Sequence, residues 1–381
     1  LTWSCLMICH VHPATGQELS GQPEARPPEK MISYYNQILK KDPQNLEAAT
    51  SLMESYYQIG EYRKSLLYAN VSEDIFQNMR KIKQAEVSND KTEFLFYIYQ
   101  TRGKARHKIG DYRKALEDYG DAMELDGEDP DLMVDIGNLY YNMKKYDSAL
   151  FYFRSAALGH PVDFKARFNM ANTFYVKKNY DSAIYYYRES IEIKDDFPYA
   201  YFYLGTIFSE MGEFEKAVNQ FNRALRIWPD KSEIYFRRAL SHQSLQHYQE
   251  ALTDWNMVLM LDSLNYDALR NRALVKFSMG QRKGAMNDLD LLIQKHEEEV
   301  NAWFIRGRYF FIKKRYKKAL PDIQEALDRG LENEEAYYIA GFINMKQKHV
   351  QQACKYLRKA DEMGFELDNR SMKFLKTCHP E

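Results

Sequence analysis

The chain has 381 residues and a formal net charge of −1, from 53 basic and 54 acidic side chains. A charge this balanced produces no field that would indicate a nucleic-acid partner. No run approaches the roughly eighteen apolar residues that a membrane span needs. The sequence therefore predicts neither nucleic-acid binding nor a membrane span.

The first 30 residues leave two interpretations open. Leu1 to Val11 is mostly apolar, and the segment from Ala14 to Gly16 has small residues at the spacing that a signal peptidase prefers. Residues 1–16 are then either a signal-peptide remnant of an exported, periplasmic or envelope-associated protein, or the disordered leader of a cytoplasmic one. Residues 17–30 hold three prolines among polar side chains and predict a linker.

A strict period of 34 residues organises the chain after residue 30. Alanine recurs at this period at Ala115, Ala149, Ala183, Ala217, Ala251, Ala285, Ala319 and Ala353. A second small position recurs in phase at Gly103, Gly137, Ala171, Gly205, Ala239, Ala273, Gly307 and Gly341. A large apolar residue follows 16 positions later at Tyr119, Phe153, Tyr187, Phe221, Trp255, Leu289, Ile323 and Leu357.

Each period contains two segments with helical spacing around a turn. In the clearest one, the first segment runs from Tyr199 to about Met211 and the second from Phe214 to about Ile227, where Pro229 ends it. We expect Gly205 of the first helix to face Ala217 of the second, because small residues allow two helices to touch.

This period and pattern resemble the tetratricopeptide repeat family over nearly all of the chain after residue 30. The resemblance implies an all-α fold: a right-handed α-solenoid of about nine 34-residue helix–turn–helix repeats plus an N-terminal half repeat. One hairpin cannot bury its apolar face alone, so neighbouring hairpins stack and share a continuous core.

Residues 31–95 depart from the regular pattern. Residues 31–41 predict a lone second helix, and residues 46–79 a degenerate first repeat with Met53 at the small position. The step from Ser65 to Ala115 is 50 residues, so 16 are inserted. We expect residues 71–86 to extend a helix and residues 88–90 to form the turn of a longer hairpin. This hairpin is either a partner-specific projection or sequence drift.

Residues 96–367 predict the regular array, and residues 368–381 a short helical cap at its end. Gly284 and Pro321 fall inside predicted second helices and predict a bend near residues 280–325. The four cysteines are too few and too scattered to indicate a disulfide framework. Cys354 is expected to be a plain core thiol.

No motif for catalysis, phosphate binding or metal binding is present, so we predict no enzyme activity, no cofactor and no metal site. The densest basic run, residues 313–318, spans an inter-helix turn, as do Lys144–Lys145 and Lys177–Lys178. These lysines are either solvated turn residues or a docking patch for acidic lipid or protein.

The resemblance places the first helices on a concave groove. There, the residues three before, one after and four after the small position should point inward. The candidates for partner binding are Asn138, Tyr141, Phe168, Asn172, Tyr175, Phe202, Phe236, Arg270, Phe304, Arg308, Phe311 and Tyr338.

Most of these candidates are aromatic, which favours a protein-binding surface. Alternatively, the rings are buried between neighbouring first helices. Asn138 and Asn172 could bond a peptide backbone. Val134 and Phe168 stand where the family's carboxylate clamp has lysine, so an apolar or extended peptide fits better than an acidic C-terminus.

We therefore predict a non-catalytic scaffold that binds a protein or peptide segment in an aromatic-lined groove. Two alternatives remain: a structural or assembly subunit of an exported or envelope-associated complex that uses its edges, and a regulatory subunit of an enzyme complex. The sequence names no partner and fixes no oligomeric state.

Overall fold

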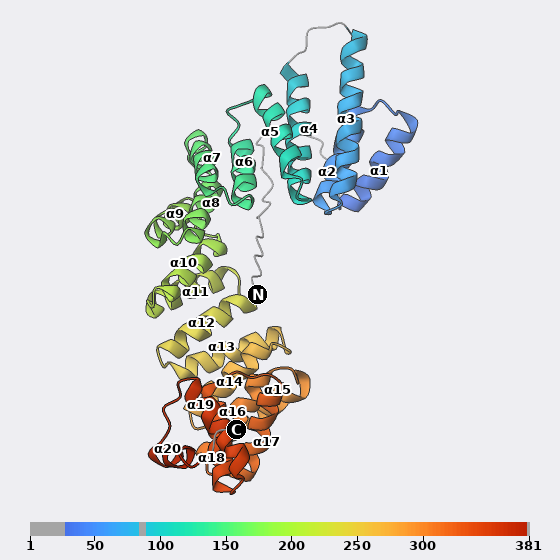
Figure 1. Cartoon of the computed structure of the whole chain (residues 1–381). Coiled ribbons are helices and arrows are strands. Elements are labelled where there is room, and N and C mark those ends of the chain that lie inside the picture. Colours follow the sequence, from blue (N-terminus) through green and yellow to red (C-terminus); the bar gives the residue numbers. More distant parts are fainter. Residues whose placement is uncertain (1–26, 84–88, 379–381) are drawn as a thin grey trace. The chain divides into compact units, whose positions relative to one another are not determined.

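A computed structural model describes residues 27–83 and 89–378. All regular secondary structure in these residues is helical, as the all-α prediction requires (Figure 1). Internal contacts divide the chain into unit 1, which ends at Val162, and unit 2, which begins at Asp163. The 34-residue period gave no sign of this division, and each unit is described by itself.

Unit 1 holds seven helices among its described residues. They are α1 (Pro28–Lys41), α2 (Leu46–Gln58), α3 (Tyr62–Lys83), α4 (Asn89–Lys108), α5 (Tyr112–Leu125), α6 (Pro130–Asn142) and α7 (Tyr146–Gly159).

Unit 2 continues the same alternation of first and second helices. Its helices are α8 (Phe164–Val176), α9 (Tyr180–Ile193), α10 (Pro198–Glu210), α11 (Phe214–Ile227), α12 (Ser232–Ser244), α13 (Tyr248–Leu261), α14 (Tyr266–Ser278), α15 (Arg282–Lys295), α16 (Val300–Ile312), α17 (Tyr316–Asp328), α18 (Glu334–Lys346), α19 (Val350–Glu362) and α20 (Asn369–Leu375).

The helices from α2 to α19 pair as nine hairpins in the described part of the chain, with α1 as the half repeat before them. This confirms the predicted repeat number. The leader at residues 1–26 lies outside the described residues. Residues 28–30, which we predicted as linker, form the first turn of α1 instead, because Pro28 stands at the start of the helix, where proline is tolerated.

The turn inside each hairpin needs one residue in the left-handed region. Gly212 supplies it with φ 77°, but Lys178 and Gln246 take the equivalent place with φ 57° and 60°. The N–H groups of this residue and the next bond carbonyls of the helix that ends there, for example Lys178 N to Tyr175 O at 2.8 Å. Lys144 and Lys314 have the same conformation. These lysines therefore lie in turns, as predicted.

The inserted residues lengthen two helices of unit 1. Helix α3 has 22 residues and α4 has 20, against 13 or 14 in the regular hairpins, so both project beyond α2 and α5 (Figure 1). The predicted extension over residues 71–86 is confirmed as far as Lys83. The turn predicted at residues 88–90 is wrong for Asn89 and Asp90, which already belong to α4, while Ser88 lies outside the described residues.

Close approach of the two helices in a hairpin depends on the missing side chain at the small position. A Cβ added to Gly205 would lie 2.7 Å from Cε1 of Phe221, and one added to Gly137 would lie 2.5 Å from Cε1 of Phe153. Ala217 is fully buried, but the nearest side chain to Gly205 is the Phe221 ring, not the Ala217 methyl that we expected. The large residue of the second helix thus lies flat against the backbone of the first.

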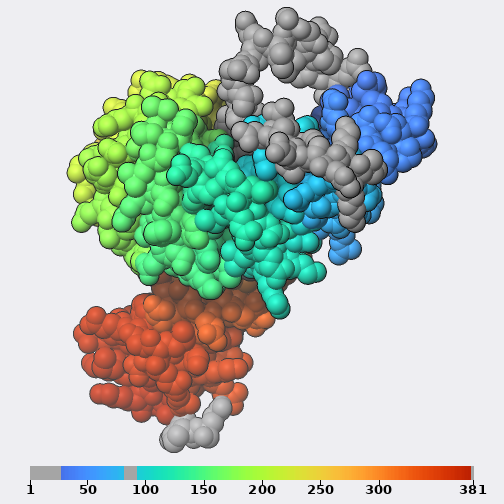
Figure 2. Space-filling model, turned by 90° about the horizontal axis from the view of Figure 1, so that it is seen from above, coloured from blue at the N-terminus to red at the C-terminus, as the bar shows by residue number. Residues whose placement is uncertain are grey.

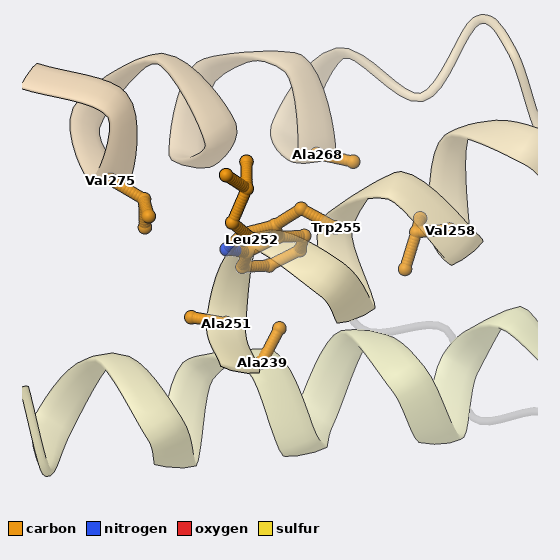
Figure 3. Close-up of a cluster of buried hydrophobic side chains, with 7 residues drawn as sticks. All are labelled: Ala239, Ala251, Leu252, Trp255, Val258, Ala268 and Val275. Atoms are coloured by element: carbon orange, nitrogen blue, oxygen red, sulfur yellow. The ribbon is translucent and has the colours of Figure 1, made fainter. Parts of the chain in front are cut away.

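The same arrangement builds the cores between hairpins. Trp255 is fully buried among Ala239, Ala251, Ala268 and neighbouring aliphatic side chains, so its indole joins three successive helices (Figure 3). Fully burying an aromatic side chain contributes about 1.5–3 kcal/mol relative to leaving it exposed.

An arginine that pairs with a buried aspartate recurs in four of the hairpins and was not predicted. Arg238 on α12 binds Asp254 of its own second helix through two bonds of 2.8 and 2.6 Å, and it also donates to Asn222 of the preceding second helix at 2.5 Å. Arg272 and Arg306 repeat these contacts at the same spacing, with their own aspartate and with Asn256 or Asp290.

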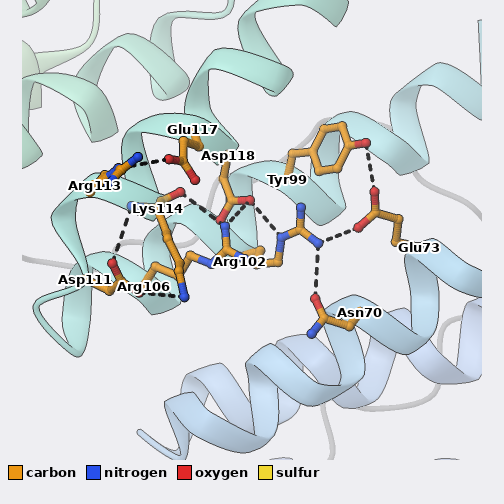
Figure 4. A network of polar contacts seen from close by, with 10 residues as sticks. All are labelled: Asn70, Glu73, Tyr99, Arg102, Arg106, Asp111, Arg113, Lys114, Glu117 and Asp118. Carbon is orange, nitrogen blue, oxygen red and sulfur yellow. Dashed lines mark hydrogen bonds and ion pairs between the residues drawn. The ribbon is translucent and has the colours of Figure 1, made fainter.

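Unit 1 contains the fourth example, at Arg102 (Figure 4). Its Nε donates to Asp118 at 2.8 Å, and its Nη1 donates to Asn70 on α3 at 3.1 Å and also binds Glu73. Arg106 binds the same Asp118 oxygen at 2.7 Å. We call each such group, an arginine with its own aspartate and the partner on the preceding second helix, an arginine clamp.

The C-terminal end corrects one prediction and confirms another. Cys354 is not a free core thiol, since it forms a disulfide with Cys378, with the two Cα atoms 5.8 Å apart. The predicted closing helix is present as α20, and the chain beyond it brings Cys378 back to α19. In the space-filling view, the orange and red helices of the last repeats form one closely packed body (Figure 2).

Helix α17 is continuous from Tyr316 to Asp328 with Pro321 inside it. The predicted bend near residues 280–325 stays a prediction.

The small position gives a first test. We expect Gly205→Ala to destabilise the protein by about 1–3 kcal/mol, because the added methyl meets the buried Phe221 ring. The matched control is Gly120→Ala in α5, where an added Cβ meets nothing within 4 Å and should stabilise by roughly 0.5–1 kcal/mol. Urea unfolding followed by circular dichroism measures both, and equal effects of the two substitutions would contradict this account.

The arginine clamp gives a second test. Arg238→Leu leaves the buried Asp254 carboxylate without its partner, which should cost about 3–5 kcal/mol. The double variant Arg238→Leu, Asp254→Gln copies the pair that stands one repeat earlier, Leu204 and Gln220, and should recover most of that loss. Thermal unfolding of the single and double variants measures the difference; a double variant no more stable than the single one would refute the interpretation.

Candidate functional site

The candidate site is the first-helix face, which we define as the residues three before, one after and four after each small position. Asn138 and Tyr141 lie on α6 in unit 1. The other ten candidates belong to unit 2. They lie on α8, α10, α12, α14, α16 and α18.

The phenylalanines three before the small position are half-buried, not fully exposed. Phe168, Phe202 and Phe236 each contact the large ring of their own second helix, with centroid distances of 5.6 Å to Tyr187, 6.2 Å to Phe221 and 5.0 Å to Trp255. Phe304 packs in the same way against the cluster that contains Ile323. Each ring therefore packs against the core with part of its surface and exposes the rest to solvent.

Aromatic candidates further along the first helices form a group at the end of unit 2. The Phe311 ring lies 6.3 Å from Tyr338 and 5.5 Å from Phe342, and both contacts are edge-on. Phe311 and Tyr338 are also half-buried. These rings join α16 to α18, so they too connect neighbouring repeats.

One polar candidate links α8 to α10. The hydroxyl of Tyr175 donates to Glu210 Oε1 at 2.7 Å, while Tyr180 donates to the other oxygen of that carboxylate at 3.0 Å. Burial, together with the hydrogen bond to Glu210, raises the pKa of Tyr175, so the phenol stays protonated and remains a donor. Glu210 therefore holds two successive hairpins together.

Three more polar candidates make the same kind of link. Arg270 lies 3.3 Å from Glu299 at the start of α16, and Arg308 donates to Glu335 of α18 at 2.7 Å. The Tyr338 hydroxyl donates to Asp368 before α20 at 3.0 Å, and burial with this bond raises its pKa to about 12. Successive first helices are thus joined by bonds along their shared face.

Asn172 was expected to bond a peptide backbone. Its side-chain oxygen accepts a hydrogen bond of 2.5 Å from the hydroxyl of Tyr187, the buried ring beneath it. This bond uses the acceptor of the amide and not its N–H donors. Asn138 also interacts with another group of the protein, so both asparagines already have a partner within the chain.

Unit 1 has first-helix-face residues that the sequence analysis missed. Gln100, Lys104 and His107 stand three before, one after and four after Gly103. Gln100 and Lys104 both bind Asp135 on α6, at 3.1 and 3.2 Å. Extending the same register one repeat toward the N-terminus would have found them. This part of the face is polar and charged where that of unit 2 is aromatic.

His107 in this group is buried and lies 2.6 Å from the amide of Asn142. Burial, with a smaller effect of the neighbouring Lys108, lowers its pKa to about 4. Its imidazole is therefore neutral at physiological pH and adds no charge to the face.

Nothing among the described residues indicates chemistry at this face. No group of three or more His, Cys, Asp or Glu side chains in residues 27–83 and 89–378 could hold a metal ion. No helix in this part of the chain is long and apolar enough to cross a membrane.

Family models for the tetratricopeptide repeat match residues 96–129, 134–200, 203–258, 270–333 and 334–363, more than half of the chain. No curated protein matches significantly.

Among solved structures, the C-terminal part of a tetratricopeptide repeat protein from Cytophaga hutchinsonii matches at 16% identity and a TM-score of 0.55, over 61% of this chain and 96% of that one. A repeat protein from Parabacteroides merdae matches at 19% identity and a TM-score of 0.48, over 65% and 97%. YrrB, described as a repeat protein with an unusual peptide-binding site, matches at 20% identity and a TM-score of 0.44, over 48% and 95%.

The helix pairs, the 34-residue period and the family matches agree. The chain belongs to the tetratricopeptide repeat family, a family of typically non-catalytic scaffolds, and this membership implies interaction with other proteins.

Proposed function

We propose that the protein is a non-catalytic scaffold that binds a segment of a partner protein along the first-helix face of unit 2. The observation that carries this proposal is the recurrence of a half-buried ring at one register position. It is phenylalanine on α8, α10, α12 and α16, and Tyr338 on α18. Rings fixed by packing on one side lose little freedom when a partner covers the other side, which favours affinity.

The polar groups of this face define the kind of partner. Tyr175, Arg270 and Arg308 already bond carboxylates of neighbouring repeats. A ligand that relied on these groups would have to break bonds between repeats. An extended segment whose apolar side chains pack against the Phe202 and Phe236 rings makes no such demand, so we infer an apolar, extended partner segment.

A second candidate site is the long hairpin of unit 1. Phe94 and Tyr97 on the N-terminal part of α4 are 41% and 37% exposed, and α3 and α4 project beyond the neighbouring helices. This favours the alternative in which an edge of the protein contacts its partner.

The Cys354–Cys378 disulfide bears on the compartment of the protein. Disulfides are found mainly in oxidising compartments, so this bond supports the exported interpretation of the leader.

The proposal is tested by affinity capture from the native cell, with mass spectrometry of the eluted proteins. Phe202→Leu with Phe236→Leu removes both rings but keeps apolar volume against Phe221 and Trp255, so the fold should tolerate it. We expect the variant to lose its partner, with a fall in affinity of roughly tenfold or more once the partner is purified.

Two controls locate the site. Tyr185→Leu on α9 changes a ring that is 56% exposed but lies off the first-helix face, and it should leave binding unchanged. Phe94→Ser on α4 should also leave it unchanged. If the two-leucine variant binds the partner as well as wild type does and Phe94→Ser does not bind it, the binding site lies on the long hairpin and not on the first-helix face.

A further inference from the structure

The C-terminal helix α20 is held to the last hairpin by three contacts. Asp368, just before the helix, accepts the hydrogen bond from Tyr338. Phe374 and Leu375 pack against the buried cluster of Leu357, Ala360 and Leu367. The disulfide between Cys354 and Cys378 then fixes the chain just beyond the helix.

The covalent contact matters most because α20 is short. The helix has seven residues, well below the length at which an isolated helix is stable in water. Most of its residues are exposed, with Ser371 as the fully buried exception. The disulfide therefore limits how far α20 can move from the cluster that it covers.

The disulfide is also open to small molecules. Both cysteines are half-buried and line a cavity of about 610 Å³ beside α19. Among the described residues, Lys355, Arg358 and Lys359 line the same cavity, together with one carboxylate, Glu362. The described lining of the cavity thus combines a disulfide with more basic than acidic side chains.

Positive charge at this place affects thiol exchange in two ways. It attracts a thiol that carries carboxylates. It also stabilises the Cys354 thiolate, because Arg358 lies one helical turn further along, at the spacing that brings two side chains of a helix together. Exchange is faster when the leaving thiol is the more acidic one, so the arrangement favours attack on Cys378.

We propose that this cavity is a thiol–disulfide exchange site for a small anionic thiol, and that the Cys354–Cys378 bond controls whether α20 stays closed over the end of the repeat array. This goes beyond the proposed partner binding and does not depend on it.

The reaction balances as a two-electron reduction. The thiolate of the small molecule attacks Sγ of Cys378, the S–S bond breaks, and Cys354 leaves as a thiolate on the helix face that also carries Arg358. A second molecule of the thiol attacks the mixed disulfide on Cys378 and releases that cysteine. The two small thiols end as their disulfide, and the two cysteines take up protons from water.

The site is tested by the rate at which the full-length protein is reduced. Differential alkylation with peptide mapping measures the Cys354–Cys378 pair separately from Cys5 and Cys9. The probes are glutathione, which carries two carboxylates, and cysteamine, which is cationic. We expect Lys355→Gln with Lys359→Gln to lower the ratio of the glutathione rate to the cysteamine rate by roughly three- to tenfold.

Lys373→Gln is the matched control, since this exposed lysine on α20 does not line the cavity and should leave the ratio unchanged. A ratio that is the same in wild type and in the double-glutamine variant would overturn the exchange site.

The control of α20 has its own test. Trypsin can cut after Lys373 and Lys376, and we expect these cuts to be several-fold faster after reduction. Cys378→Ser should be cut at the fast rate with or without a reducing agent. If the oxidised and reduced proteins are cut at the same rate, the disulfide does not control α20 and the proposal fails.

Discussion

The fold depends on one contact, the large apolar side chain of each second helix lying against the backbone of the first helix at the small position. At Gly103 and Gly137 there is no room even for a methyl group, because the rings of Tyr119 and Phe153 already occupy that space. In a repeat array each hairpin contacts only its neighbours, so no distant core compensates for a poor fit within one hairpin. The recurrence of this contact therefore sets how closely the two helices of each hairpin pack.

The arginine clamp occupies a second recurring position of the repeat, and repeats without it fill that position with other residues. In the repeats with Arg238, Arg272 and Arg306, the arginine pairs with a buried aspartate and joins three helices. In two of the repeats without the arginine, tyrosine stands in place of the aspartate and stacks on a ring of the first helix: Tyr152 on Tyr140 at 5.4 Å and Tyr186 on Phe174 at 5.5 Å. A buried ion pair is seldom more stable than well-packed apolar groups. Its two fixed bonds to aspartate and a third to the preceding helix do constrain how neighbouring repeats align.

Most of the fold could be predicted from the sequence because its information is local and repeated. Residues such as Gly205 and Phe221 recur at one spacing, and that spacing alone predicts hairpins, turns and repeat number. The Cys354–Cys378 bond could not be found in this way, since it depends on how far α20 turns back toward α19, which no periodic pattern encodes. The arginine clamp was visible in the sequence as Arg and Asp 16 residues apart, but its meaning depends on burial. On the candidate face, the register placed the rings, whereas the use of Asn172 by Tyr187 required the packed structure.

The first-helix face would connect partner binding with the stability of the fold. Glu210, Glu299 and Glu335 each accept a bond from the repeat before them, so the face that would meet a partner also joins successive repeats. A ligand that competes for these carboxylates loosens the array as it binds, whereas one that covers the Phe202 and Phe236 rings reinforces the packing already present. The stability of a repeat array is a sum of contacts between neighbouring repeats. A ligand that covers the rings therefore binds without the free-energy cost of breaking those contacts, and its binding stabilises the folded array. If the proposed partner binds this face, the inter-repeat bonds therefore favour an apolar contact over one that competes for the glutamates.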